Sequence, residues 1–234
     1  MLKKNFMVTY MVEPQIKKYR YERKYIINFN YLPQFLGSLY SKNFSKKFPL
    51  RKINNVYFDD YNFTSLDENI DGLSVRKKHR IRWYGDTFNS SDKTIEIKIK
   101  NEFLNTKVNY LVPSIKLNSL NDISTLYSKI SDYVKESNNL KLHSIMSPKR
   151  PTLFNTYERM YFENLFDSVR VTIDSRLEYF SPITKMKYKE KFIIVEAKYN
   201  NELRFQNNFK NLSLTRYSKY VKGTLQTSVH NHSY

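Results

Sequence analysis

Cysteine is absent from this 234-residue sequence, which also contains only four glycines and one tryptophan. Without cysteine the protein has no disulfide, no thiolate nucleophile and no cysteine-ligated zinc site. The four histidines (His79, His143, His230 and His232) are scattered and lack the spacing of metal ligands. No apolar run reaches the roughly 18 residues of a membrane-spanning helix. A functional site in this protein is therefore expected to use carboxylate, hydroxyl and basic side chains.

The amino terminus carries a short apolar stretch, from Phe6 to Val12, behind two lysines. It ends in Glu13-Pro14 without a small-residue cleavage site, unlike a secretory signal. We therefore expect an N-terminal strand or arm of a cytoplasmic protein. The length suits one large domain or two small ones, and we expect a single domain over residues 1–234.

Positive charge dominates what is present. Forty Lys and Arg stand against 22 Asp and Glu, which gives a net charge of +18. Such a charge attracts polyanions, namely nucleic acid, anionic lipid or phosphate chains. Twenty Tyr and 16 Phe indicate packed strands and not a disordered chain. Composition alone does not distinguish these polyanions, so the positions of the basic residues along the sequence have to be considered.

Hydrophobic periodicity predicts strands interrupted by a few helices, which is typical of an α+β domain with an antiparallel sheet or barrel. Apolar residues at three- and four-residue spacing predict helices over 32–47 and 121–145. The end, 202–226, mixes a helical pattern with a basic and aromatic one. The expected strands are 19–29, 51–60, 73–84, 93–100, 107–111, 153–163, 168–175, 177–180, 185–189 and 191–199.

Basic residues recur at every second position of these strands, and residues two apart share a strand face. One face of the strand near 80 carries Arg76, Lys78, Arg80 and Arg82. In the next strand three isoleucines alternate with Glu96, Lys98 and Lys100. The same pattern aligns Glu196 with Lys198, Arg170 with Thr172 and Asp174, and Tyr157 with Arg159 and Tyr161.

Two interpretations of this alternation remain open. A half-exposed antiparallel strand commonly has one charged face, so each strand alone needs no special explanation. However, like charges along one face repel each other and favour an anion or carboxylate side chains opposite them. If the polar faces point into a closed barrel, they form a cationic tunnel suited to a row of phosphates. Glu96 or Glu196 could then hold a divalent metal.

Nine segments in order resemble the VTC (vacuolar transporter chaperone) domain family, within the triphosphate tunnel metalloenzymes. They span about residues 19–223. The resemblance implies an antiparallel β-barrel tunnel of about eight strands with flanking helices. The segments are Arg20–Tyr25, Asn54–Asp59, Asp71-Gly72, Arg80–Gly85, Glu96–Lys100, Tyr157–Arg159, Val169–Asp174, Val195–Tyr199 and Ser218–Gly223.

The resemblance also implies a function, a polyphosphate polymerase that transfers the terminal phosphate of ATP onto a growing chain with Mn²⁺ or Mg²⁺. Glu196 matches the metal-holding carboxylate of the family. The implied catalytic cations are Lys24, Arg80, Arg82, Lys98, Arg159, Arg170 and Lys219. The implied substrate-binding residues are Lys107, Tyr157 and Arg216, and the alternation along the strands adds Lys78, Lys100 and Lys198.

The family further implies ATP and polyphosphate as ligands and a separate membrane protein as a partner. Fungal polymerase subunits carry an additional phosphate-sensing domain and membrane helices, which this sequence lacks. The sequence therefore looks like the shorter bacterial version, associated with a membrane through its partner.

Three alternatives remain. The first is a tripolyphosphate or nucleoside-triphosphate hydrolase of the same superfamily, which typically has a Glu-x-Glu-x-Lys pattern on its first strand. Arg20 replaces the first Glu here and leaves Glu22 unpaired, which favours the polymerase. The second is a non-catalytic polyphosphate or inositol-phosphate binder. The third is nucleic-acid binding by the basic run at 76–82, but Ile81 and Trp83 alternate with its arginines as in a barrel wall, so nucleic acid is not expected.

Overall fold

The structure, a computed structural model, describes residues 21–88, 92–101, 104–112, 115–136, 140–147, 149–166, 168–200, 209 and 212–228. Arg20, His230 and His232 lie outside the described residues. None of the described helices is long and apolar enough to cross a membrane.

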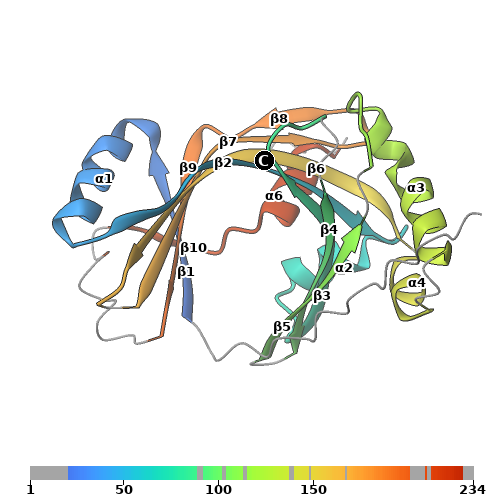
Figure 1. Cartoon of the computed structure of the whole chain (residues 1–234), viewed down its shortest axis with the longest axis horizontal. Coiled ribbons are helices and arrows are strands. Elements are labelled where there is room, and N and C mark those ends of the chain that lie inside the picture. Colours follow the sequence, from blue (N-terminus) through green and yellow to red (C-terminus); the bar gives the residue numbers. More distant parts are fainter. Residues whose placement is uncertain are drawn as a thin grey trace, which may run out of the picture.

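In the described part of the chain, ten strands form one antiparallel sheet that bends into an arch (Figure 1). Its order is β10-β1-β9-β7-β6-β2-β3-β4-β5, with β8 paired to β7. The strands are β1 (Tyr21–Asn28), β2 (Ser45–Asp59), β3 (Val75–Tyr84), β4 (Lys93–Asn101), β5 (Leu104–Val112), β6 (Arg150–Asn164), β7 (Val169–Phe180), β8 (Lys187–Lys189), β9 (Phe192–Tyr199) and β10 (Leu214–Thr215).

The antiparallel, tunnel-type sheet confirms the expected fold class, but the described sheet is not closed by hydrogen bonds. Its edge strands, β10 and β5, belong to opposite walls of the arch, and no described pair joins them. One wall consists of β10, β1 and β9, and the other of β3, β4 and β5. The long strands β2, β6 and β7 form the roof between them.

Helices cover the convex side of both walls (Figure 1). The short helix η1 (Phe29–Tyr31) leads into α1 (Leu32–Ser41), which packs Phe35 and Leu39 on the apolar face of β1, β7 and β9. Helices α3 (Asp122–Glu136) and α4 (Leu140–Met146) cover β3, β4 and β5, where Trp83 and Ile95 are fully buried. Because the apolar faces are covered from outside, the charged faces of the same strands point into the arch.

Helix α6 (Lys219–Gln226) lies on the concave side, beneath the roof. Its Tyr220 stacks on Tyr57 of β2, with 5.1 Å between the ring centres, and belongs to a buried cluster that includes Leu177 and Tyr179 of β7. Gly223 permits this approach, because a Cβ built there would lie 2.7 Å from Cδ2 of Leu153. The expected mixture of helical and basic residues near the end of the chain is thus a helix placed inside the arch.

Two expected boundaries are wrong. The helix expected over 32–47 ends at Ser41, and β2 begins at Ser45 rather than near 51. Asn43 has a φ of 59°, a left-handed conformation that ends helices, and Phe44 turns into the core. The helix expected over 121–145 is two helices, α3 and α4, and α2 (Thr64–Ile70) was not expected.

The two strands expected at 168–175 and 177–180 are one strand, β7, with an irregularity at Arg176. Arg176 has a φ of 53°, and the pairing with β6 shifts between Thr156 and Glu158. Such a bulge changes which alternate residues face one side. As a result Asp174, before the bulge, and Leu177, after it, both face the inside of the arch.

Candidate functional site

The first cluster of the tunnel lies on the wall formed by β3, β4 and β5. Glu96 is at its centre, because Arg80 and Arg82 project from β3 and Lys107 from β5 toward it. Arg80 Nε donates to Glu96 at 2.7 Å, Arg82 lies 3.7 Å away, and Lys107 also contacts the carboxylate. Burial alone would raise the pKa of Glu96, but these three cations outweigh it and lower the pKa to about 2. Glu96 is thus engaged by three cations of its own wall.

The second cluster lies on the opposite wall, where β1 pairs with β9. Lys198 contacts Glu196 at 2.8 Å and Glu22 at 3.4 Å. Lys24 lies 3.2 Å from Glu22 and 3.9 Å from Glu196 and also donates to the Tyr217 carbonyl. Burial would raise the pKa of Glu196, yet Lys198 and Lys24 hold it well below its ordinary value. Two carboxylates and two lysines therefore alternate on this wall.

The third cluster joins the roof to helix α6. Asp174 of β7 accepts from Arg159 of β6 at 2.7 Å and from Lys219 of α6 at 2.6 Å. Lys219 lies 4.8 Å and Arg159 5.3 Å from the centre of the Tyr157 ring. Burial would raise the pKa of Tyr157, but Arg159, Arg82 and Lys219 lower it. The predicted Arg159, Lys219 and Tyr157 are therefore neighbours.

An amide pair orients one of the predicted arginines. Arg82 Nε donates to Asn55 Oδ1 at 2.8 Å, and Asn55 in turn donates to Asn155 Oδ1 at 2.8 Å. Both asparagines are fully buried on the inner face of β2 and β6. Sequence reasoning missed this pair, since buried amides produce no charge pattern. It also left Asp174 out of the site, although its alignment with Arg170 and Thr172 was visible.

The two walls face each other closely enough for their charges to interact. Burial lowers the pKa of Lys98 on β4, and Glu22, Lys24 and Lys198 on the opposite wall act on the same ammonium group. Burial also lowers the pKa of Lys78, to about 7, with further contributions from Lys24 and Lys98. The charged side chains of the two walls thus influence one another's pKa values across the interior of the arch.

A cavity of about 960 Å³ lies at the tunnel mouth beside α2 and α6. Basic side chains dominate its polar lining, and Lys78 donates there to Ser218 at the start of α6 at 3.1 Å. Burial raises the cost of keeping these cations charged without an anion. The predicted residues in this lining are Lys24, Lys78, Lys98, Lys100 and Arg216.

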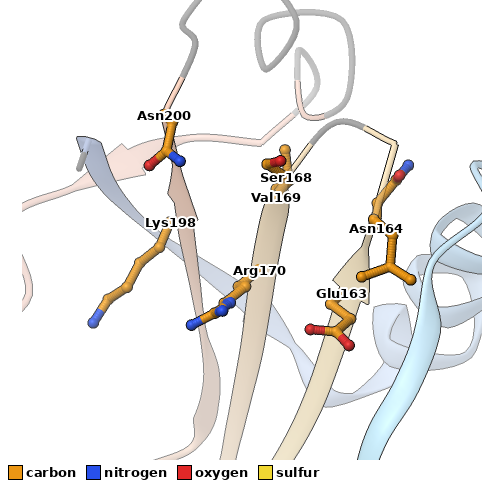
Figure 2. Close-up of a pocket in the computed structure, with 8 residues that line it drawn as sticks. Glu163, Asn164, Ser168, Val169, Arg170, Lys198 and Asn200 are labelled. Atoms are coloured by element: carbon orange, nitrogen blue, oxygen red, sulfur yellow. The ribbon is translucent and has the colours of Figure 1, made fainter. Parts of the chain in front are cut away.

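A smaller pocket of about 210 Å³ lies where the β6–β7 turn meets the end of β9 (Figure 2). Arg170 pairs in register with both Glu163 and Lys198, and the Arg170 and Lys198 side chains extend to the same side of the strands. Lys47 of β2 engages Glu163. Arg170 is therefore at the border of the site, apart from the Asp174 cluster.

Several predicted cations have no acidic partner in the described part of the chain. Among the described residues, no Asp or Glu lies within ion-pair distance of Lys78, Lys98, Lys100, Arg170 or Arg216. Each described carboxylate of the three tunnel clusters, in contrast, is engaged by at least two cations. The tunnel therefore has a surplus of positive charge that an anion would balance.

The sequence matches the VTC domain family over residues 19–228. The chain belongs to the VTC domain family. No significant match exists among proteins with curated functions. The fold of this VTC domain is similar to solved structures at low identity. One is a proposed adenylate cyclase from Bacillus halodurans, with a TM-score of 0.51, 11% identity, and coverage of 88% of this chain and 98% of that one.

A second similar structure is a proposed adenylyl cyclase from Hippeastrum that has a dominant triphosphatase activity. Its TM-score is 0.52 at 12% identity, with coverage of 90% of this chain and 97% of that one. At such identity these structures support the fold of the VTC domain alone.

The VTC domain family implies a divalent cation, and the donors on β1 and β9 suit one. Glu22 and Glu196 are neighbours, and the pKa of each is lowered, although burial raises both and repulsion from Glu196 raises that of Glu22. Within the described ranges no group of three or more His, Asp or Glu side chains forms a metal cluster. Mg²⁺ commonly uses one or two protein carboxylates together with substrate phosphates. The donor set therefore fits a cation shared with a phosphate chain.

Proposed function

We propose that this VTC domain is an ATP-dependent polyphosphate polymerase that works inside its cationic tunnel. The main observation behind the proposal is that the charged side chains of the tunnel fall into two groups. The described carboxylates of the clusters are all neutralised by neighbouring cations, while a second set of cations has no acidic partner among the residues that the structure describes. That second set needs an extended anion, which a chain of phosphates provides.

The lowered pKa values of the tunnel carboxylates favour transfer of phosphate to a phosphate chain over transfer to water. Hydrolysis benefits from a general base with a pKa near the working pH. The pKa of Glu96 is about 2, and cations hold the pKa values of Asp174 and Glu196 below their ordinary values despite burial. Such groups are weak bases. A terminal phosphate is already an anion at neutral pH, so it attacks without a base.

The side chains would then act by positioning and charge stabilisation, which dominate phosphoryl transfer. Arg80, Arg82 and Arg159 would hold the triphosphate, and Lys98 would face it from β4. An oxygen of the terminal chain phosphate forms a bond to the γ-phosphorus of ATP as the bond to the β–γ bridging oxygen breaks. The products are ADP and a chain longer by one phosphate.

Glu196, with Glu22 beside it, would hold the Mn²⁺ or Mg²⁺ that neutralises charge on the phosphate oxygens. The proposal includes ATP and polyphosphate as the ligands, no nucleic acid, and a cytoplasmic location with a separate membrane protein as a partner. It assigns the whole site to one domain. Lys100 and Arg216, which line the cavity at the tunnel mouth, would guide the chain, and Arg170 would contact phosphate from the border of the site.

The test is incubation of the purified protein with ATP and Mn²⁺, or Mg²⁺, followed by gel separation and polyphosphate staining. Chains of increasing length with release of ADP are expected. Lys98→Ala and Glu196→Ala should reduce chain synthesis at least tenfold, whereas Lys187→Ala, an exposed lysine on β8, should not.

Other outcomes have definite meanings. Free phosphate without chains would assign the protein to the hydrolases of this fold. Tight polyphosphate binding without turnover would make it a binding module. Full activity of both tunnel variants would refute the assignment of the site.

A further inference from the structure

An aromatic cluster surrounds Arg51 on the inner side of the arch, at the end of the tunnel away from α2 and α6. The Arg51 guanidinium lies 4.4 Å from the centre of the Phe48 ring, 5.7 Å from that of Tyr161 and 5.9 Å from that of Tyr84. Phe48 and Tyr161 meet edge to face. Tyr84 is 47% exposed, so its ring is accessible at this end of the tunnel.

This cluster is continuous with the candidate phosphate site. Tyr161 is shared, because Arg159 lies 5.9 Å from its ring centre on one side and Arg51 lies near it on the other. Arg51 and Arg159 are also paired in register between β2 and β6. A ligand held by Arg159 through phosphate therefore reaches the aromatic cluster with its next few atoms.

Strand β3 gives the scale of the tunnel. Lys78 and Tyr84 lie on the same face, six residues apart, which corresponds to about 20 Å along a strand. Arg80 and Arg82 lie between them on that face. The order along the strand is thus the cavity lysine, the two arginines of the triphosphate site, and the exposed aromatic ring.

The two ends of the tunnel differ in chemistry. The described lining of the 960 Å³ cavity is rich in Lys and Arg, and its one aromatic residue is the buried Tyr217. The Arg51 end presents flat rings and a planar guanidinium. One end suits a phosphate chain and the other suits a flat, uncharged ring system.

We propose that Tyr84, Arg51 and Phe48 form a stacking site for the nucleobase of the nucleoside triphosphate, so that the tunnel has a nucleoside end and a chain end. The inference rests on the proposed function in that a nucleotide is the phosphate donor. The base stacks on Tyr84 beside the Arg51 guanidinium, which Phe48 supports from behind. Stacking of this kind accepts any base, so ATP and GTP bind similarly.

The experiment is a calorimetric titration with two probes, the non-hydrolysable ATP analogue AMP-PNP and tripolyphosphate, each with the same concentration of Mg²⁺. Tyr84→Leu removes the ring, and Tyr84→Phe retains it. Tyr40→Leu is the control, because Tyr40 is 50% exposed but lies on α1, on the convex side. Thermal unfolding of each variant checks that it is folded.

In Tyr84→Leu, AMP-PNP should bind about tenfold more weakly, as expected for the loss of one stacked base. Tripolyphosphate should bind with unchanged affinity, and Tyr84→Phe and Tyr40→Leu should bind both probes like the wild type. An equal change for both probes, or none for either, would overturn the stacking site. This experiment measures binding and not chain synthesis. If the protein makes no polyphosphate but Tyr84→Leu weakens only AMP-PNP binding, the polymerase proposal would be refuted and the stacking site would still be supported.

Discussion

Replacing Asp174 by Asn tests how the centre of the tunnel is held together. The side chain of Asp174 is 1% exposed and is shared by Arg159 and Lys219, whose side chains are only 14% and 12% exposed. Asn has nearly the same shape but no charge. The variant therefore retains the packing and leaves two cations facing each other with little solvent around them.

The expected cost follows from this burial. Removal of one partner from a buried ion pair typically costs 3–5 kcal/mol, because the remaining charge stays desolvated. Since both cations here retain partial access to solvent, we expect the lower end, about 3 kcal/mol. For a protein of this size, that corresponds to a decrease of about 6–12 °C in melting temperature.

Urea unfolding monitored by circular dichroism, together with calorimetry, measures this loss. Asp132→Asn is the matched control, since Asp132 is exposed on α3, and its free energy of unfolding should change by less than about 0.5 kcal/mol. Saturating tripolyphosphate should raise the melting temperature more in Asp174→Asn than in the wild type, because its charges replace the lost carboxylate.

The reasoning would be refuted if Asp174→Asn were as stable as Asp132→Asn. That result would mean that Arg159 and Lys219 reach water or other partners without cost. A loss of stability with no additional rescue by tripolyphosphate would support a structural role for Asp174 and contradict the position of the phosphate beside it.

Three further predictions concern other parts of the site. Tripolyphosphate binding at pH 8 should take up close to one proton in the wild type but not in Lys78→Met, because a lysine with a pKa of about 7 is mostly neutral at pH 8 until a bound anion restores its charge. Calorimetry in two buffers of different ionisation enthalpy measures the proton uptake, and equal uptake by the two proteins would contradict the prediction. The pKa of Glu96 is lowered from 4.5 to about 2, so the stability that its ion pairs contribute is present above pH 4.5 and is lost as the pH falls toward 2. The urea midpoint of unfolding should therefore decrease less steeply between pH 6 and pH 2 in Glu96→Gln than in the wild type, and the same pH dependence in both proteins would refute this. Gly223→Ala should destabilise by about 1–3 kcal/mol in thermal unfolding, because its methyl group meets Leu153 and Tyr179, and an unchanged melting temperature would show that α6 can shift.

Alternation along single strands made much of the tunnel predictable. Ile95 and Ile97 are buried beneath α3 and α4, while Glu96 and Lys98 point into the arch, as their spacing predicted. The period of two is a local property of an extended backbone, so it can be read without the fold. The order of the VTC motifs then predicted the antiparallel tunnel-type sheet.

The tertiary structure decided which charges meet. Asp174 lies 45 residues from Lys219, and Lys24 lies 172 residues from Glu196. Such contacts depend on strand order and on the helix that enters the arch, and neither is a local property. The sequence pattern likewise gave equal weight to Arg170, which the fold places at the border of the site.

By itself, the sequence determined the residue types, the surplus of positive charge and the face of each strand on which the charges lie, because these follow from composition and backbone periodicity. Only the tertiary structure decided which cations engage Glu96, and that Lys24 and Lys198 each contact both Glu22 and Glu196. It also placed one aromatic and one cationic end on the tunnel. The physical reason is that pKa values, ion pairs and cavities depend on distances across the arch, which arise only when distant strands pack together.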